Sequence, residues 1–270
     1  MTSSNCLLVD IGNSRLKWNL ALGNANVFGR QTQAVDYKAR SMDDVLSEQW
    51  GDIKAPIPHV AIVNVAGNTV AQQIIDWCAN HWDVHPTFAS SAVRFKTVTN
   101  GYKDYRQLGA DRWMAVIAAH QRKPDQHSVI IDCGSAITVD VVTVDGQHKA
   151  GPIIPGRDMM LNALAANTAD LDNRYDKNSG SSGLSGSVFA DGTHAAVVNG
   201  VNFAIGKALD TIIHDIRETL AGAGNDAQVE ILVTGGAAKQ VMPLTGITHY
   251  TLEPDLILHG LYIVNAAQLT

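Results

Sequence analysis

The chain has 270 residues, a formal net charge of −6 and 46% hydrophobic residues. This length allows one large domain or two modest ones, and the apolar fraction is ordinary for a globular protein with a core. The acidic balance, without any run of lysine or arginine, argues against a nucleic-acid-binding protein.

The sequence predicts neither a membrane span nor a secretion signal. No apolar stretch reaches the roughly 18 residues that a bilayer span needs, and the polar N-terminus leads directly into a strand pattern. Cys6, Cys78 and Cys133 have no metal-type spacing, which favours reduced, buried thiols. We therefore expect a cytoplasmic protein.

The first half of the chain alternates between strand and helix patterns. Cys6 to Val9 predicts a buried strand, Leu16 to Leu20 alternates as a second strand, and Gly23-Asn24 is a turn signal. The later predictions are a helix over 42–50, a strand over 59–65, a helix over 70–81, a short strand over 93–98 and a helix over 108–119.

Lys123-Pro124-Asp125 breaks the pattern and predicts a domain boundary, giving domains 1–124 and 125–270. In the second domain, Asp145-Gly146 is a hairpin signal. The predicted elements are strands over 127–132 and 136–144, a helix over 159–169, a mobile Ser/Gly-rich loop over 177–192, a helix over 193–220, a strand over 229–233 and a helix over 255–267. The order predicts an α/β fold with mixed sheets flanked by helices.

One phrase occurs twice: an apolar run, then Asp, any residue, Gly, and a hydroxyl or amide side chain. The first copy runs from Leu7 to Ser14 and is followed by Lys17; the second runs from Ile130 to Ser135. Such a strand ending in a glycine loop lets backbone approach phosphate and places a carboxylate near a metal ion. Two copies suggest two related halves that close on one nucleotide.

Each copy has a plainer interpretation beside the functional one. Asp10 suits Mg²⁺ through water, and Lys17 can neutralise phosphate charge, but a plain polar hairpin turn explains the first copy about equally well. In the second copy Asp132 could hold a cation and Ser135 could donate to phosphate. Asp140 is better explained as a solvated charge at a strand end.

Asp111 and Arg112 open an otherwise apolar helix after Gly109. Asp111 could act as a general base and Arg112 could hold an anionic or amide substrate by a forked hydrogen bond. The alternative is an ordinary acid stabilised at a helix N-terminus. Thr193 could likewise meet a ligand or simply cap the helix that follows it.

Taken together, the motifs resemble the type III pantothenate kinases, which include the Bvg accessory factors. They occur in the family's order: DIGNSRLK, NGY with LGADRW, DCGSAITVD, GPIIPG with NTADL, the DGT loop and VTGGAA. The chain departs from the family's common pattern at four places. Ser135 stands where Thr is frequent, Ala150-Gly151-Pro152 where Gly-Gly is usual, and Ala190-Asp191-Gly192-Thr193 where Gly-x-Asn-Thr is frequent, and the segment over 103–107 lacks a common proline. The resemblance implies two ribonuclease-H-like, actin-like ATPase domains.

The resemblance also implies roles for single residues. Asp111 would be the catalytic base, Asp132 would bind K⁺ or NH₄⁺, and Asp10 would hold Mg²⁺ through water. ATP would be bound by Asp10, Ile11, Gly12, Asn13, Ser14, Arg15, Leu16, Lys17 and Ser135. Pantothenate would be bound by Tyr102, Gly109, Ala110, Asp111, Arg112 and Thr193.

The implied reaction is phosphorylation of pantothenate by ATP to 4′-phosphopantothenate, the first step of coenzyme A biosynthesis, in a homodimer with the pocket near its interface. Phosphoryl transfer needs positioning and charge neutralisation, which these residue types supply. Two alternatives stay open: another small-molecule kinase of the same superfamily, and a regulatory accessory protein that keeps the fold without activity.

Overall fold

The computed structural model describes residues 5–21, 31–53, 57, 59–167, 189–222 and 228–268. The chain forms two compact units, the first from Met1–Pro124, Asp145–Lys149 and Asp255–Thr270, the second from the rest. The expected division at Pro124 differs from this in two segments, because residues 145–149 and 255–270 pack with the first unit. The Gly23-Asn24 turn and most of the 177–192 loop lie outside the described residues.

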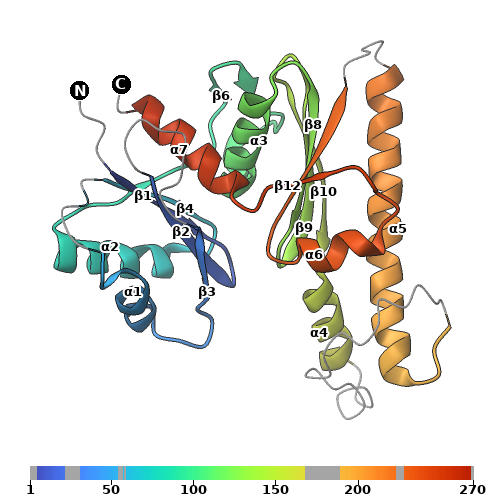
Figure 1. The fold of residues 1–270 in the computed structure, drawn as a ribbon, viewed down its shortest axis with the longest axis horizontal. Helices are drawn as coiled ribbons and strands as arrows, with labels where there is room; N and C mark the ends of the chain where they lie inside the picture. Colours follow the sequence, from blue (N-terminus) through green and yellow to red (C-terminus); the bar gives the residue numbers. More distant parts are fainter. Residues whose placement is uncertain are drawn as a thin grey trace. The chain divides into compact units, whose positions relative to one another are not determined.

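A five-stranded sheet forms the centre of the first unit (Figure 1). Its order is β3-β2-β1-β4-β5, with β1 antiparallel to β2 and parallel to β4. The strands are β1 (Cys6–Ile11), β2 (Arg15–Ala21), β3 (Gln33–Asp36), β4 (His59–Asn64) and β5 (Thr87–Phe88).

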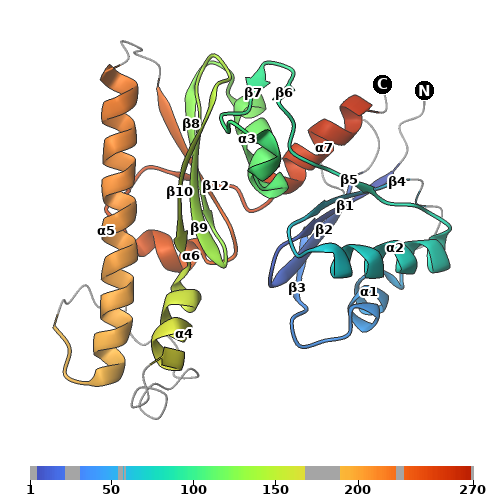
Figure 2. The same cartoon turned by 180° about the vertical axis from the view of Figure 1, so that it is seen from behind.

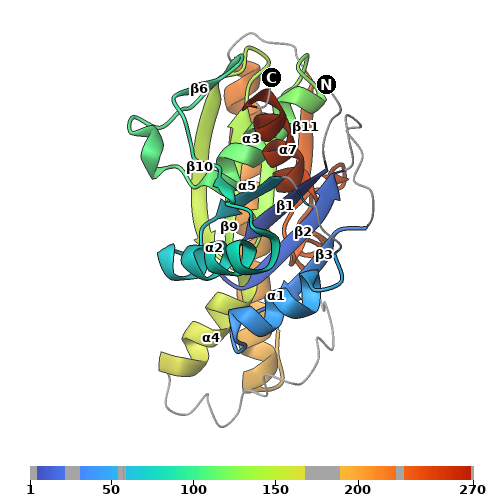
Figure 3. The same cartoon turned by 90° about the vertical axis from the view of Figure 1, so that its left-hand side faces the viewer.

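Helices lie on both faces of this sheet (Figures 1 and 2). On one face, α1 (Met42–Trp50) and α2 (Asn68–Trp82) bury the alternate side chains Leu7, Val9 and Ile11 of β1 in a shared core. On the other, α3 (Ala110–Arg122) and α7 (Leu256–Gln268) pack side by side, as Figure 3 shows.

The second unit has its own sheet, of order β10-β9-β8-β11-β12. The strands are β8 (His127–Cys133), β9 (Ala136–Val142), β10 (His148–Pro155), β11 (Val229–Thr234) and β12 (Thr251–Leu252). One face is covered by α4 (Arg157–Asn167), α5 (Thr193–Gly222) and the short α6 (Ala238–Val241), followed by η2 (Met242–Leu244). Figure 2 shows α5 and α6 on one side of the sheet, with α4 beyond the ends of its strands.

The two sheets have the same connectivity. β8 is antiparallel to β9 and parallel to β11, as β1 is to β2 and β4. Each copy of the repeated Asp-x-Gly phrase therefore ends the central strand of its sheet. The predicted α/β fold with mixed sheets and flanking helices is confirmed. The expectation that Asp140 is a solvated charge at a strand end is wrong, because Asp140 is 2% exposed within β9, opposite Ile130.

α5 departs from one expectation. By length and composition alone it could cross a bilayer, since a window in Thr193–Ala221 has a mean hydropathy of 1.2 and is 28% buried. The expectation that no segment reaches this length is wrong for α5. A core helix passes the same test, and α5 packs Ile205, Leu209 and Ile213 into the core of the second unit.

The predicted strand over 93–98 is instead a small hairpin of β6 (Arg94–Phe95) and β7 (Val98–Thr99). The turn places Lys96 at φ 51°, a left-handed conformation that interrupts a continuous strand. A short 3₁₀ helix, η1 (Tyr105–Gln107), then leads toward α3.

Candidate active site

The first glycine loop is a tight connection between β1 and β2. The Gly12 N–H donates to the carbonyl oxygen of Arg15 at 3.0 Å. The antiparallel register places Asp10 opposite Lys17 at the end of β1. Asp10 is buried and Lys17 half-buried, so a carboxylate and an ammonium side chain flank the loop from neighbouring strands.

Not every predicted nucleotide residue offers its side chain at this loop. Ile11 and Leu16 are fully buried in the core with α1 and α2, so only their backbone groups could meet a ligand. The Arg15 guanidinium pairs with Asp36 at 2.8 Å on the surface. Asn13 is exposed and Ser14 half-buried at the turn itself.

Tyr37 supports the same loop and was not predicted from the sequence. Its hydroxyl donates to the Gly12 carbonyl at 2.6 Å, and its backbone N–H donates to the Ser14 carbonyl at 3.3 Å. Burial raises the pKa of Tyr37, so the phenol stays a donor at neutral pH. Tyr37 belongs to no motif, and no sequence signal points to it.

The second glycine loop is closely packed against backbone within its own unit. A Cβ at Gly156 would lie 2.5 Å from the carbonyl oxygen of Ser135, and the Gly156 N–H donates to that oxygen at 3.0 Å. A Cβ at Gly235, which has φ +91°, would lie 2.4 Å from Asp132 Oδ1. The structure thus brings the GPIIPG and VTGG motifs to the loop that carries Asp132 and Ser135.

The proposed substrate residues gather at the start of α3. Gly109 caps the helix, and a Cβ there would lie 2.5 Å from Asp111 Oδ1. The same Oδ1 accepts the Arg112 backbone N–H at 2.7 Å. Asp111 is half-buried, and Ala110 beside it is the first residue of the helix. The absence of a side chain at Gly109 is therefore what lets this carboxylate sit over the helix N-terminus.

Arg112 is 7% exposed and points to Tyr102. Its Nη1 donates to the Tyr102 hydroxyl at 3.1 Å, and its guanidinium carbon lies 5.9 Å from the centre of the Tyr102 ring. Two motifs that are separate in the sequence, NGY and LGADRW, thus meet at one buried cation.

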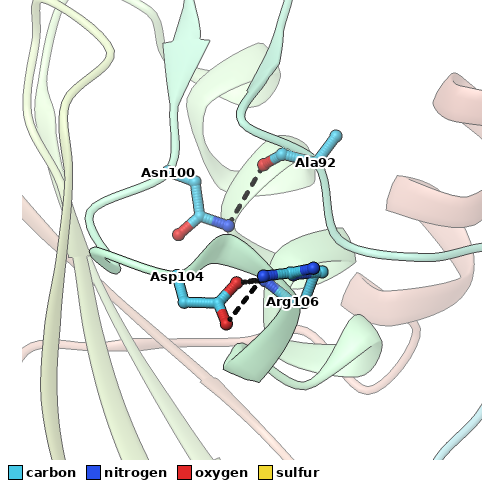
Figure 4. Close-up of polar contacts among 4 residues, drawn as sticks. All are labelled: Ala92, Asn100, Asp104 and Arg106. Atoms are coloured by element: carbon cyan, nitrogen blue, oxygen red, sulfur yellow. Dashed lines mark hydrogen bonds and ion pairs between the residues drawn. The ribbon is translucent and has the colours of Figure 1, made fainter.

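Polar contacts hold the segment between these motifs. The Asn100 side chain donates to the carbonyl of Ala92 at 3.2 Å, and the Arg106 guanidinium pairs with Asp104 at 2.8 Å (Figure 4). The Arg106 hydrogen bond lowers the pKa of Asp104, so this exposed carboxyl stays ionised. Ser91 Oγ donates to the carbonyl of Leu108 at 2.8 Å, just before the helix.

Thr193 belongs to the second unit. It is exposed at the first position of α5 and lines an apolar groove of about 770 Å³ between α4 and α5. The groove is lined by Pro155, Met159, Met160, Ala163, Leu164, Thr193, Ala196, Val197, Gly200, Val201 and Ala204.

Asp10 and Asp132 are carboxylates that could each help to hold a cation beside a glycine loop. Among the described residues, no three His, Cys, Asp or Glu side chains gather as metal ligands. A single buried carboxylate such as Asp10 suits Mg²⁺, which keeps waters and takes phosphate oxygens from a nucleotide. Asp132, half-buried at a strand end beside loop carbonyls, offers the oxygen donors that a monovalent cation takes.

Comparison with known proteins identifies the family. A family model described as type III pantothenate kinase matches residues 6–215. The type III pantothenate kinase of Nitrosococcus oceani is 34% identical over 260 residues, 94% of this chain and 91% of that protein. The one from Methylibium petroleiphilum is 33% identical over 270 residues, 96% of this chain and 98% of that protein.

Solved structures share the fold. A structure described as a Baf family transcriptional activator from Campylobacter jejuni has a TM-score of 0.55 at 19% identity and covers 97% of this chain and 98% of its own. The activator of 2-hydroxyisocaproyl-CoA dehydratase from Clostridium difficile, with bound ADPNP, has a TM-score of 0.53 at 12% identity, covering 100% of this chain and 96% of its own. The fold is the predicted actin-like ATPase fold. Because a family model matches most of the chain and relatives above 30% identity cover nearly all of it, the chain belongs to the type III pantothenate kinase family.

Proposed function

We propose that this kinase transfers the γ-phosphoryl group of ATP to the primary hydroxyl of pantothenate, giving 4′-phosphopantothenate in the first step of coenzyme A biosynthesis. The observation that carries the proposal is the arrangement at the start of α3, where the half-buried Asp111 carboxylate accepts the Arg112 backbone N–H and the buried Arg112 guanidinium contacts Tyr102.

Asp111 is the proposed general base. The Arg112 N–H and the bare Gly109 backbone fix its carboxylate at the first turn of α3. A carboxylate held in this way can orient a hydroxyl in line with the γ-phosphate and accept its proton.

Arg112 is the proposed substrate anchor. Its guanidinium is buried and already oriented by Tyr102, so little freedom is lost when it binds an anionic or amide group. Gly109 and Ala110 are half-buried at the same helix start, where the substrate would lie.

The two glycine loops are the proposed ATP site. Loop N–H groups and Lys17 would bind phosphate oxygens of the nucleotide in the first unit, and Ser135 would donate to it from the second. Asp10 would hold Mg²⁺ through water and Asp132 would hold K⁺ or NH₄⁺; these ions, when bound, neutralise phosphate charge. The ADPNP bound by the dehydratase activator of the same fold supports an adenine nucleotide.

The proposal includes a cytoplasmic homodimer. The described cysteines are free and buried, as thiols of a reducing compartment are. The apolar groove between α4 and α5 supports self-association, because exposed apolar grooves mark interaction sites.

The decisive test replaces Asp111 by Asn, which keeps an oxygen acceptor for the Arg112 N–H but cannot take a proton. Loss of a general base costs about 10²–10⁴ in rate. We expect Asp111→Asn to lose turnover to that extent with unchanged folding, measured by pantothenate-dependent ADP release with Mg²⁺, in K⁺, NH₄⁺ and Na⁺.

Asp43→Asn is the matched control, because Asp43 is also the second residue of a helix in the first unit but is exposed. It should keep full turnover. Near wild-type turnover by Asp111→Asn would contradict the base assignment. A wild-type protein that releases no ADP with pantothenate in any of these cations would contradict the kinase and favour the regulatory alternative. Release with a sugar or acetate instead would reassign the substrate.

A further inference from the structure

His148 stands beside the substrate residues, although no motif includes it. It is 3% exposed, begins β10 and belongs to the 145–149 segment that packs with the first unit. We propose that His148 is a positioning residue that sets pantothenate affinity by fixing the backbone of the Tyr102 loop. This inference rests on the proposed function, because it assigns a role within the same site.

Backbone contacts lay the 97–101 segment along the 146–148 segment. The Thr99 N–H donates to the carbonyl of Gly146 at 2.9 Å, and Thr99 forms a bridge with Gln147. Gly146 has φ +77°, and a Cβ there would lie 2.4 Å from the carbonyl oxygen of Thr97. A Cβ at Gly101 would lie 2.1 Å from the His148 carbonyl oxygen, so the two backbones approach too closely at Gly101 and Gly146 for a side chain at either glycine.

The His148 ring completes this contact at the residue before Tyr102. The Gly101 N–H donates to His148 Nδ1 at 3.3 Å. The ring is nearly parallel to that of Tyr102, at 13° with centroids 6.5 Å apart, and tilted at 59° to Trp113. One side chain therefore fixes both the backbone before Tyr102 and one side of its ring.

His148 affects substrate binding through Arg112. The Tyr102 hydroxyl accepts from Arg112 Nη1 at 3.1 Å, so the position of Tyr102 sets the orientation of the buried guanidinium. A Tyr102 loop that is free to shift would weaken the hydrogen bond between Tyr102 and Arg112. Pantothenate would then bind to fewer pre-oriented groups, while the glycine loops and Asp111 would stay in place.

His148 acts as a hydrogen-bond acceptor, so a substitution can test this role separately from the volume of the side chain. Nδ1 accepts an N–H, so it carries no proton in this contact. Asn places an amide oxygen at a similar distance from the main chain and can accept the same N–H, whereas Leu keeps volume but no acceptor. His148→Asn should therefore keep the hydrogen bond, and with it the pantothenate affinity, that His148→Leu loses.

A second buried histidine supplies the control. His127 is 2% exposed in the second unit, and its Nδ1 accepts the backbone N–H of Val144 at 3.2 Å. His127→Leu removes the same kind of hydrogen bond at the same burial, but in the second unit, whereas Tyr102 and Arg112 belong to the first.

The test combines kinetics with hydrogen–deuterium exchange of the peptide covering 97–107, both on the full chain. For His148→Leu we expect a pantothenate KM about five- to tenfold higher, the size of one lost backbone hydrogen bond, with kcat and the ATP KM nearly unchanged. Hydrogen–deuterium exchange in 97–107 should also rise in His148→Leu. His148→Asn should restore the wild-type pantothenate KM and exchange rate. His127→Leu should change neither the pantothenate KM nor the exchange of this peptide.

An unchanged pantothenate KM in His148→Leu overturns the proposal, with or without faster exchange. Equal changes in kcat, both KM values and global stability also overturn it, because they show a purely structural residue. Failure of the proposed function is distinguishable: wild-type protein would then release no ADP with pantothenate, while the exchange measurement would still test whether His148 holds the 97–107 segment.

Discussion

At the residue scale, polar side chains of the first unit are buried where they hold turns of the main chain. The Tyr37 hydroxyl fixes Gly12, the His148 ring fixes Gly101, and Ser91 fixes the carbonyl before α3. Each forms a side-chain hydrogen bond to a backbone group, which is worth about 0.5–1.5 kcal/mol. The candidate loops are therefore fixed by residues outside the motifs.

His120 predicts a pH dependence of stability. It is 3% exposed, and its Nε2 lies 3.2 Å from Thr97 Oγ1. Burial lowers the pKa of His120, and the charge of Asp145 opposes this only in part. A lowered folded pKa means that the unfolded chain binds this proton more readily, so stability is full above the unfolded pKa, about 6.5, and falls below it.

We therefore expect the free energy of unfolding to fall between pH 7.5 and pH 5.5, and less so in His120→Gln, which keeps a polar nitrogen for Thr97 but does not titrate. Urea unfolding of both proteins at the two pH values measures this. The other nine histidines contribute equally to both proteins. The same pH sensitivity in the variant would contradict the assignment to His120.

The sequence indicates candidate residues where chemistry and spacing form a motif, such as Asp10, Asp132 and the Asp111-Arg112 pair, and their roles stay predictions. It missed Tyr37 and His148, because their roles arise only when distant segments pack. The sequence spacing between Gly12 and Tyr37, or between Gly101 and His148, does not indicate that these residues are in contact. The contacts follow from how the segments pack in the fold.

At the element scale, hydrophobic periodicity predicted the long elements well. The central strands β1 and β8 and the helix α3 were found because buried runs and 3.6-residue spacing are strong signals. The edge strands β5 and β12 have two residues each and leave no such signal. The 93–98 hairpin needed a left-handed Lys96, which sequence alone does not favour.

The packing of α7 on α3 depends on one glycine. A Cβ at Gly260 would lie 2.0 Å from the carbonyl oxygen of Met114, a backbone atom that cannot rotate away. Gly260→Ala should destabilise the first unit by about 1–3 kcal/mol or more, as overpacking does. All five tryptophans lie in that unit, so fluorescence-detected urea unfolding measures its stability directly.

Gly206→Ala is the matched control, because its Cβ would lie 2.2 Å from the carbonyl oxygen of Leu244 in the second unit, which has no tryptophan. It should lower stability in circular dichroism and shift the fluorescence midpoint less than Gly260→Ala does. A fluorescence midpoint of Gly260→Ala equal to that of the wild type would contradict the close α3–α7 packing.

At the scale of the whole molecule, the sequence predicted two halves of similar design. It did not predict which half each segment of the chain packs with. The repeated Asp-x-Gly phrase predicted two related halves, and the two sheets have the same strand order. Yet α7, the last helix, packs with the first unit. Its mostly apolar sequence suits burial in either unit, so packing rather than periodicity decides where it goes.

The proposed homodimer gives the last prediction. Met159 and Leu164 in the α4–α5 groove are 48% and 41% exposed in one chain, and only 28% of the apolar window of α5 is buried. A second copy on this face would bury that surface. Met159→Glu should cost one protomer little, because the side chain is half-exposed, but would place an unpaired charge inside the interface. Light scattering should therefore give twice the chain mass for wild type and less for Met159→Glu.

Leu252→Glu is the control, since Leu252 is 40% exposed on β12, the opposite edge of the sheet from the strand that precedes α4. It makes the same apolar-to-acid change outside the groove and should leave the dimer intact. A wild-type protein with the mass of one chain would contradict the homodimer itself. A dimer that survives Met159→Glu would instead move the interface away from α4 and α5, because a buried unpaired carboxylate costs more than a groove of this kind can offset.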